Sequence, residues 1–225
     1  PDVQAELARR AARAGKHLLL DKPVALGVEA AAALRDEADA AGVRSVVFFT
    51  DRFVDTSREW FAQAQESADL RGGWLRWFGT LDAPHSPYRD SAWRREHGAL
   101  WDIGPHAFST LSGALGPVTS VSAVAGERDL VNLTLHHESG AMSTATLTQF
   151  APPPAGGFEC AVWGTDGILP MPPRPADTAV SSLLATAAQE LVASVDAAEP
   201  HPLDLSFGVR VVELVAEAEA SIRAR

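Results

Sequence analysis

Apolar residues in the first fifty positions follow a helix–strand–helix–strand order. Segments 3–14 and 28–41 repeat alanine and leucine at helical spacing, and each is followed by a glycine, which suits a helix C-terminus. Segments 17–20 and 45–50 are short apolar runs, typical of strands covered on both faces. This order predicts part of a doubly wound α/β sheet.

The pattern changes after residue 51, where β-rich runs become frequent. A turn of composition Glu-Ser-Gly at 138–140 joins two of these runs and predicts a hairpin. The expected strands are 74–80, 118–124, 130–136, 141–148, 158–163 and 167–169, and the expected helices are 56–68, 98–115, 179–197 and 204–224. We therefore expect an α+β domain at 52–225, with an open, mainly antiparallel sheet and helices on one face, after an α/β domain at 1–51.

Composition narrows the classes of function. The chain has 225 residues, of which 46% are apolar and 21% charged, as in globular proteins with a sizeable core. A net charge of −10 argues against nucleic acid or an anionic membrane as a partner. No apolar run reaches membrane-spanning length, and the chain has no signal-peptide pattern. The single cysteine, Cys160, excludes an internal disulfide and indicates a cytoplasmic protein.

The main candidate for chemistry is the stretch 98–108. It places Asp102 and His106 four residues apart, and on a helix this spacing brings two side chains to one face. A carboxylate beside an imidazole fixes its tautomer and stabilises the imidazolium, so the pair could act as a general base. The alternative is structural: Pro105 suits the first turn of a helix, and Asp102 would then be its N-cap.

A second candidate follows the short strand at 17–20. Asp21, Lys22 and Pro23 come directly after it, and ligands of open α/β sheets gather at the carboxyl ends of strands. Lysines are scarce, since the chain has two of them against seventeen arginines. A lysine at a strand end therefore indicates a role for an ammonium group there.

Together the two stretches resemble the Gfo/Idh/MocA family of NAD(P)-dependent oxidoreductases. The family's E-K-P signature corresponds to Asp21-Lys22-Pro23, with Asp in place of Glu. Its G-G-G-x-x-x-D-x-G-x-H signature corresponds to the run ending at His106, with Glu96 and His97 in place of the first two glycines. The resemblance extends from residue 1 to about residue 116 and becomes weak beyond it.

The resemblance implies hydride transfer between NAD or NADP and a hydroxyl-bearing carbon of a sugar, inositol or similar polyol. It gives His106 the role of proton acceptor, Asp102 the role of orienting it, and Lys22 the role of stabilising negative charge on the oxygen. The residues implied at the cofactor are Asp21, Lys22 and Pro23, and those implied at the substrate are Tyr88, Trp93 and Arg94. It also implies a homodimer or homotetramer formed through the C-terminal sheet.

One part of the family pattern is missing. No G-x-G-x-x-G turn follows any expected strand. The resemblance therefore implies that the sequence begins in the middle of a Rossmann domain. We therefore expect either a longer natural polypeptide or a protein that has lost its cofactor half. Two other functions stay open: NAD-dependent glycoside hydrolysis, and a non-catalytic ligand-binding or oligomerisation module. No metal site is expected, because the adjacent His136 and His137 would point to opposite faces of a strand.

Overall fold

The computed structural model describes residues 2–67 and 69–224, which form two compact units. Unit 1 comprises residues 1–54 and 175–216, and unit 2 comprises residues 55–174 and 217–225. The first boundary lies three residues beyond the one expected at 51. The segment 175–216 differs more from the expected division, because it belongs to unit 1 and not to the second domain expected at 52–225. Its helix α6 (Val180–Ser194) packs on both strands of the first sheet.

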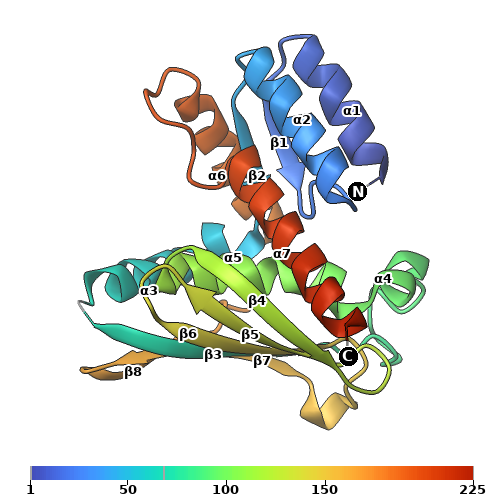
Figure 1. Cartoon of the computed structure of the whole chain (residues 1–225), viewed down its shortest axis with the longest axis vertical. Helices are drawn as coiled ribbons and strands as arrows, with labels where there is room; N and C mark the ends of the chain where they lie inside the picture. Colours follow the sequence, from blue (N-terminus) through green and yellow to red (C-terminus); the bar gives the residue numbers. More distant parts are fainter. Residues whose placement is uncertain (1, 68, 225) are drawn as a thin grey trace. The chain divides into compact units, whose positions relative to one another are not determined.

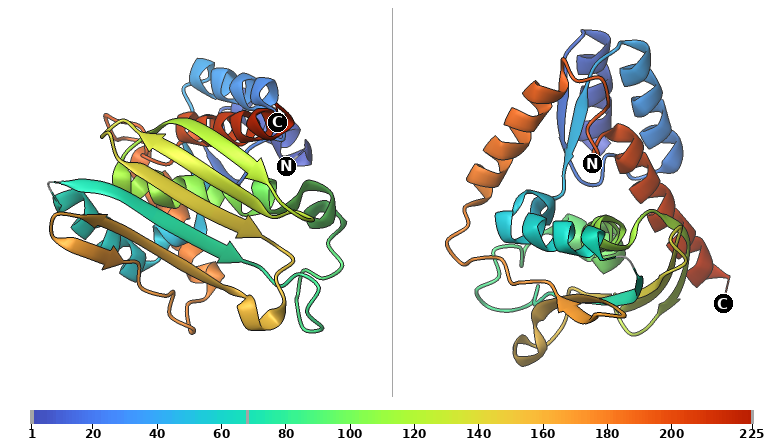
Figure 2. Two further views of the ribbon diagram at one scale, coloured as in Figure 1. Left: turned by 60° about the horizontal axis from the view of Figure 1, so that its bottom comes forward. Right: turned by 90° about the vertical axis from the view of Figure 1, so that its left-hand side faces the viewer.

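Unit 1 contains a two-stranded parallel sheet of β1 (Leu18–Asp21) and β2 (Ser45–Phe48), in which Leu18 pairs with Ser45. All four residues of β2 are buried, which explains why its sequence is apolar without alternation. Helices α1 (Asp2–Arg13) and α2 (Val28–Ala40) lie side by side on this sheet, and α6 covers it from the opposite side (Figure 2). The unit is completed by η1 (Thr50–Phe53) and most of α7 (Leu205–Arg223).

Unit 2 is organised around a six-stranded sheet in the order β4-β5-β6-β3-β7-β8 (Figure 1). Neighbouring strands are antiparallel except for β3 and β6, so the expected open, mainly antiparallel sheet is confirmed. The strands are β3 (Leu70–Phe78), β4 (Val118–Ala125), β5 (Val131–His137), β6 (Met142–Thr148), β7 (Gly157–Gly164) and β8 (Gly167–Pro170). The hairpin predicted at 138–140 joins β5 to β6.

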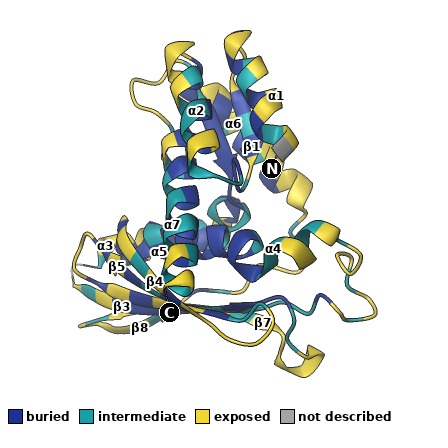
Figure 3. Ribbon diagram, turned by 45° about the vertical axis from the view of Figure 1, so that its right-hand side comes forward, coloured by how far each residue is buried: buried dark blue, intermediate teal, exposed yellow. Residues whose placement is uncertain are grey.

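One face of this sheet is covered by α3 (Asp55–Glu66), α4 (Ala92–Asp102) and α5 (Gly104–Leu115), as Figure 2 shows. The strand β5 alternates accordingly, with its leucines buried toward the helices and Asn132 and His136 exposed (Figure 3). The opposite face carries the exposed apolar side chains of Met142, Trp163 and Ile168. None of the described helices combines the length and apolar character that a membrane-crossing segment needs.

Candidate functional site

The helix expected from Gly98 to Leu115 is divided in the structure. Its first part, α4, ends at Asp102, and α5 begins at Gly104, with only Ile103 between them. Asp102 and His106 therefore lie on either side of a junction of one residue, and Ile103 keeps right-handed helical dihedrals there. The N-cap alternative is wrong, because Ile103 occupies the N-cap of α5. Pro105 lies in the first turn of α5, where a missing N–H costs nothing.

A second irregularity lies inside α4 at Gly98, whose φ of 64° and ψ of −171° are not helical. The helix restarts at Ala99, whose N–H donates to Asp129 Oδ2 at 3.0 Å. A Cβ on residue 98 would lie 3.2 Å from the Cβ of Asp129, so both the conformation and the space favour glycine. The Asp129 carboxylate also accepts bonds from Thr148 and Gln149, which fixes this break in α4.

Asp102 is held by Arg94, one of the residues implied at the substrate. The Arg94 Nε lies 2.9 Å from Asp102 Oδ2, and only 13% of the Asp102 side chain is exposed. The ion pair joins the part of α4 before Gly98 to the part after it. On its other side the Arg94 guanidinium lies 3.8 Å from the centroid of the Tyr88 ring. Tyr88, Arg94 and Asp102 thus form one cluster, which we call the Asp102 cluster.

Trp93 has different neighbours from Arg94, although it was also implied at the substrate. Its ring stacks on that of His97, with centroids 4.9 Å apart and an interplanar angle of 15°. The His97 Nδ1 lies 3.0 Å from the Trp93 carbonyl oxygen. Within the described part of the chain, these contacts link Trp93 to its own helix and not to the Asp102 cluster.

His106 has an aromatic neighbour that sequence reasoning missed. The Trp77 ring of β3 lies 5.5 Å from the His106 ring, centroid to centroid. Phe158 of β7 meets Trp77 edge to face at 5.2 Å, because the two residues are register partners in the sheet. The sequence placed Trp77 in a strand but gave no sign of the face it occupies. Trp77 and Phe158 therefore form an aromatic surface beside the His106 imidazole.

Asp21, Lys22 and Pro23 lie at the carboxyl end of β1 in unit 1, as expected. The Asp21 side chain accepts from the Lys22 N–H at 2.8 Å, and the Lys22–Pro23 peptide is cis. The Gln4 side chain bonds the backbone of Asp21 in both directions, at 2.9 Å and 2.8 Å, and so joins α1 to this strand end. Asp102 and His106 belong to unit 2.

The residues of unit 1 fit only part of a dinucleotide site. The carboxyl edge of its parallel sheet suits a nucleotide ligand. However, the sequence has no glycine-rich turn for phosphate, and the first turn of α2, which follows β1, carries Glu29, a carboxylate that repels an anion. The 225 residues therefore do not form a complete dinucleotide site. Among the described residues, no cluster of three or more histidine, cysteine or acidic side chains is arranged to hold a metal ion.

Comparisons with solved structures show a common fold. The chain superposes with a TM-score of 0.80 on GenD2 from gentamicin A biosynthesis in complex with NAD, at 18% identity over 99% of this chain and 74% of that one. For the WlbA dehydrogenase from Bordetella pertussis with NADH and UDP-GlcNAcA the values are 0.79, 20%, 98% and 74%. For a putative myo-inositol dehydrogenase from Sinorhizobium meliloti they are 0.80, 18%, 99% and 76%.

Family comparisons agree with both the first and the second half of the sequence. No protein of curated function matches the chain by sequence. Residues 1–49 match the oxidoreductase family with an NAD-binding Rossmann fold, and residues 69–169 match the GFO/IDH/MocA C-terminal domain. The Rossmann match comes before the C-terminal match along the chain, as the resemblance implies. Together the two matches include Lys22, Asp102 and His106. The chain belongs to the Gfo/Idh/MocA family of NAD-binding oxidoreductases.

Proposed function

We propose that this chain carries the proton-transfer residues of an NAD-dependent dehydrogenase that oxidises a hydroxyl-bearing carbon of a sugar, inositol or similar polyol. The observation that carries the proposal is the helix junction in unit 2. There a largely buried carboxylate, Asp102, is fixed by Arg94 and precedes His106, whose ring lies beside Trp77. NAD, when bound, supplies the acceptor for the hydride. All other work falls to the side chains of the protein.

In the proposed reaction His106 accepts the proton of the substrate hydroxyl, and Asp102 orients the imidazole and favours its charged form. Arg94 acts through Asp102, because its guanidinium is committed to that carboxylate and to the Tyr88 ring. Lys22 stabilises the negative charge that develops on the oxygen. Trp77 and Phe158 offer an apolar surface that suits the C–H face of a sugar or inositol ring.

The substrate class is supported by the named neighbours. One was crystallised with UDP-GlcNAcA, and another is described as a putative myo-inositol dehydrogenase. NAD is favoured over NADP because GenD2 was crystallised with NAD and the WlbA dehydrogenase with NADH. We also propose a cytoplasmic location, since the only cysteine is free and buried.

The test begins with a calorimetric titration of NAD, followed by a screen of inositols, sugars and sugar acids for NAD reduction. His106→Gln should lower kcat/KM by about 100-fold or more, the usual contribution of a general base. The matched control is His136→Gln, which alters an exposed histidine of β5. Lys22→Met should lower kcat far more than NAD affinity. Full activity of His106→Gln would overturn the proposal.

The same experiment separates the two other functions. A glycoside substrate cleaved without net formation of NADH, with NAD needed only in catalytic amounts, indicates glycoside hydrolysis. No binding of NAD by residues 1–225, combined with no binding by any longer natural form, indicates a non-catalytic module. Binding by a longer form alone agrees with the missing phosphate-binding turn and leaves the dehydrogenase proposal intact.

We also propose that two or four copies of the chain associate through the outer face of the six-stranded sheet. Register places Met142, Trp163 and Ile168 in one row across this face, and they are 49%, 41% and 65% exposed. Apolar rows of this kind are typical of subunit interfaces. Ile168→Glu should convert the oligomer to a monomer in light-scattering measurements, whereas Val192→Glu, on α6, should not. An unchanged mass for Ile168→Glu would contradict this interface.

A further inference from the structure

A single helical turn, residues 99–102, carries the Asp102 carboxylate. It follows the non-helical Gly98, and Ile103 separates it from α5. The Ile103 N–H closes the turn by donating to the Ala99 carbonyl at 2.8 Å. A turn of this length forms too few backbone hydrogen bonds to fix its own position. Contacts from other elements therefore decide where Asp102 points.

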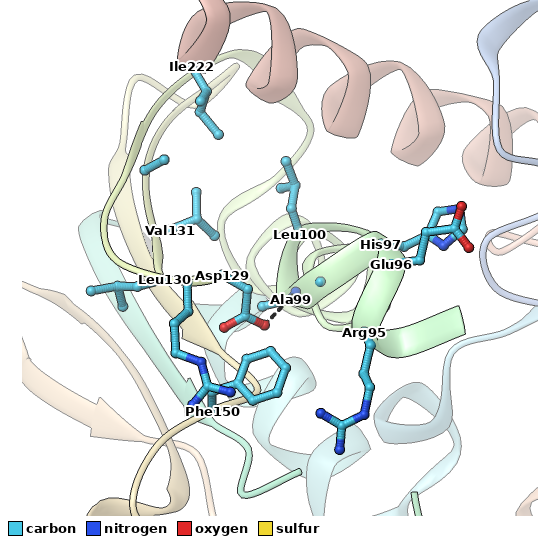
Figure 4. A pocket seen from close by; sticks show the side chains of 13 residues that line it. Arg95, Glu96, His97, Ala99, Leu100, Asp129, Leu130, Val131, Phe150 and Ile222 are labelled. Atoms are coloured by element: carbon cyan, nitrogen blue, oxygen red, sulfur yellow. Dashed lines mark hydrogen bonds between the residues drawn. The ribbon is translucent and has the colours of Figure 1, made fainter. Parts of the chain in front are cut away.

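Both ends of the 99–102 turn are bonded to other side chains of unit 2. At the first end Asp129 accepts the Ala99 N–H at 3.0 Å, the bond drawn as a dashed line in Figure 4. At the last end Arg94 lies 2.9 Å from the Asp102 carboxylate. Two attachments leave rotation about the line between them least restrained, and a contact between the two ends is needed to oppose it.

Such a contact comes from the last part of α7. The Trp101 Nε1–H donates to Glu219 Oε1 at 2.8 Å. Trp101 is only 7% exposed, and 34% of the Glu219 side chain is exposed. Because the acceptor is a carboxylate, this bond is stronger than one between neutral groups. Glu219 thus holds the middle of the turn.

The end of α7 that carries Glu219 is itself anchored. It belongs to unit 2, as do α4 and β4. The Ser221 Oγ accepts the N–H of Ala123, a residue of β4, at 2.9 Å. Arg223 lies one helical turn beyond Glu219, with its Nη1 3.5 Å from Glu219 Oε2. Glu219 is therefore fixed against the six-stranded sheet and gives Trp101 a stationary acceptor.

Apolar packing beside this bond is open. Leu100, the neighbour of Trp101, and Ile222, three residues after Glu219, point toward the same space (Figure 4). Both line a pocket of about 520 Å³. An unfilled space provides no packing contacts that could fix the turn against α7. The hydrogen bond therefore supplies the orientation that close packing would give in a filled core.

We propose that Glu219 is a positioning residue of the dehydrogenase. Through Trp101 it holds the 99–102 turn in the orientation in which Asp102 orients His106. The inference rests on the proposed function, because it assigns a role in the same proton transfer. In this role Glu219 and Trp101 act through Asp102 and touch no reacting atom. A small rotation is enough to matter, since a misplacement of about 1 Å can cost about 100-fold in rate.

The central test is a double-mutant cycle with Asp102→Ala, measured as kcat for the polyol substrate in the form of the protein that binds NAD. Glu219→Ala alone should lower kcat by about tenfold. In the Asp102→Ala background it should lower kcat by less than about twofold, because the carboxylate that it positions is absent. A purely structural role would lower kcat by the same factor in both backgrounds, and that result would overturn the proposal.

Two conservative variants identify the bond as the cause. Glu219→Gln keeps an oxygen that accepts the Trp101 N–H, so it should retain kcat within about threefold. Trp101→Phe keeps an aromatic ring but removes the donor, and it should repeat the loss caused by Glu219→Ala. The proposal is contradicted if Glu219→Gln is as impaired as Glu219→Ala or if Trp101→Phe is fully active.

The matched control is Glu213→Ala, on the same helix. The Glu213 side chain is 35% exposed, almost as Glu219 is, and it pairs with Arg210 of its own helix. Glu213→Ala should leave kcat unchanged. An equal loss in the two variants would assign the effect to the charge of α7 and not to the bond with Trp101.

A readout without turnover separates this proposal from the proposed function. A carboxylate fixes the tautomer of a neighbouring imidazole, so in NMR spectra of the full chain the His106 ring signals of Glu219→Ala should shift toward those of Asp102→Ala. Full activity of His106→Gln would remove the proposed function and this role with it. If His106→Gln is inactive while Glu219→Ala keeps full activity and unshifted His106 signals, the positioning role alone is overturned.

Discussion

The two units stabilise their parts of the proposed machinery in different ways. Unit 2 builds the surroundings of His106 on six hydrogen-bonded strands. Unit 1 presents Lys22 at the end of a sheet with only two strands, too few to be stable without packed helices. Those helices come from both ends of the sequence, 2–13 and 180–194 among them. The comparison teaches that the histidine has a self-supporting scaffold, whereas the lysine depends on helices far apart in the chain.

The largest effect should come from matched core truncations, Leu135→Ala in unit 2 and Leu34→Ala in unit 1. Both leucines are 0% exposed. We expect the free energy of unfolding to fall by about 2 to 5 kcal/mol, with Leu135→Ala at the upper end. Strand β5 is bonded to neighbours on both sides and cannot close the cavity, whereas α2 can move toward its sheet. Urea unfolding measures both, and equal losses would contradict the contrast.

The next effect concerns two glycines of positive φ, Gly98 in unit 2 and Gly42 in unit 1. Their φ values are 64° and 63°, and Ala in the left-handed region costs about 1–2 kcal/mol. The ψ of −171° at Gly98 lies outside that region, in one that essentially only glycine adopts, so the backbone cost is higher at residue 98. A Cβ at residue 42 meets nothing within 4 Å, but one at residue 98 crowds Asp129. Gly98→Ala should therefore lower the melting temperature more. It should also lower activity, since the Arg94–Asp102 pair spans this break. If Gly98→Ala melts at the same temperature as Gly42→Ala, the Asp129 side chain moves aside from the new Cβ at little cost, which would contradict this expectation.

A smaller, pH-dependent effect belongs to unit 2. Burial lowers the pKa of His137 below its ordinary value of 6.5. The Nδ1–H donates to the Gly116 carbonyl and Nε2 accepts from Ser143, each at 2.8 Å. The unfolded chain thus binds the proton more readily, so stability is full above about pH 6.5 and falls as the pH drops through the lowered pKa. Thermal melts at several pH values should show this slope, and His137→Gln should reduce it. An unchanged slope would assign the effect to other groups.

The smallest effect belongs to unit 1. Hydrogen bonds from Arg9 and Arg13 lower the pKa of Glu37 from 4.5 to about 2. The stabilisation is therefore present above pH 4.5 and is lost as the pH falls toward 2. Glu37→Gln should lower the melting temperature slightly at neutral pH, and 1 M salt should shrink that difference because exposed ion pairs are screened. A decrease as large as that of Leu34→Ala would mean that unit 1 relies on charge more than on its core.

Local patterns predicted most elements but not the long-range contacts. The apolar runs located β1, β2 and the β5–β6 hairpin, because the residues within a strand show by themselves which of its faces are buried. They missed the break at Gly98, which is fixed by Asp129 thirty residues away. They also missed the return of 175–216 to unit 1 and the Trp77–His106 contact, which depend on how distant segments pack. The charged candidate residues were proposed from spacing and resemblance, and the contacts that the structure gives them were not predicted.

Arg94 and Arg95 are neighbours in α4, yet one serves Asp102 and the other serves Asp82. Successive side chains on a helix diverge by about 100°, so a single turn is tethered in two directions. Asp82 and Asp102 are therefore not independent in evolution. Replacing either acid would release one of the two arginines and change the selection that acts on the other acid. We expect Asp82, Arg94, Arg95 and Asp102 to be conserved or replaced together.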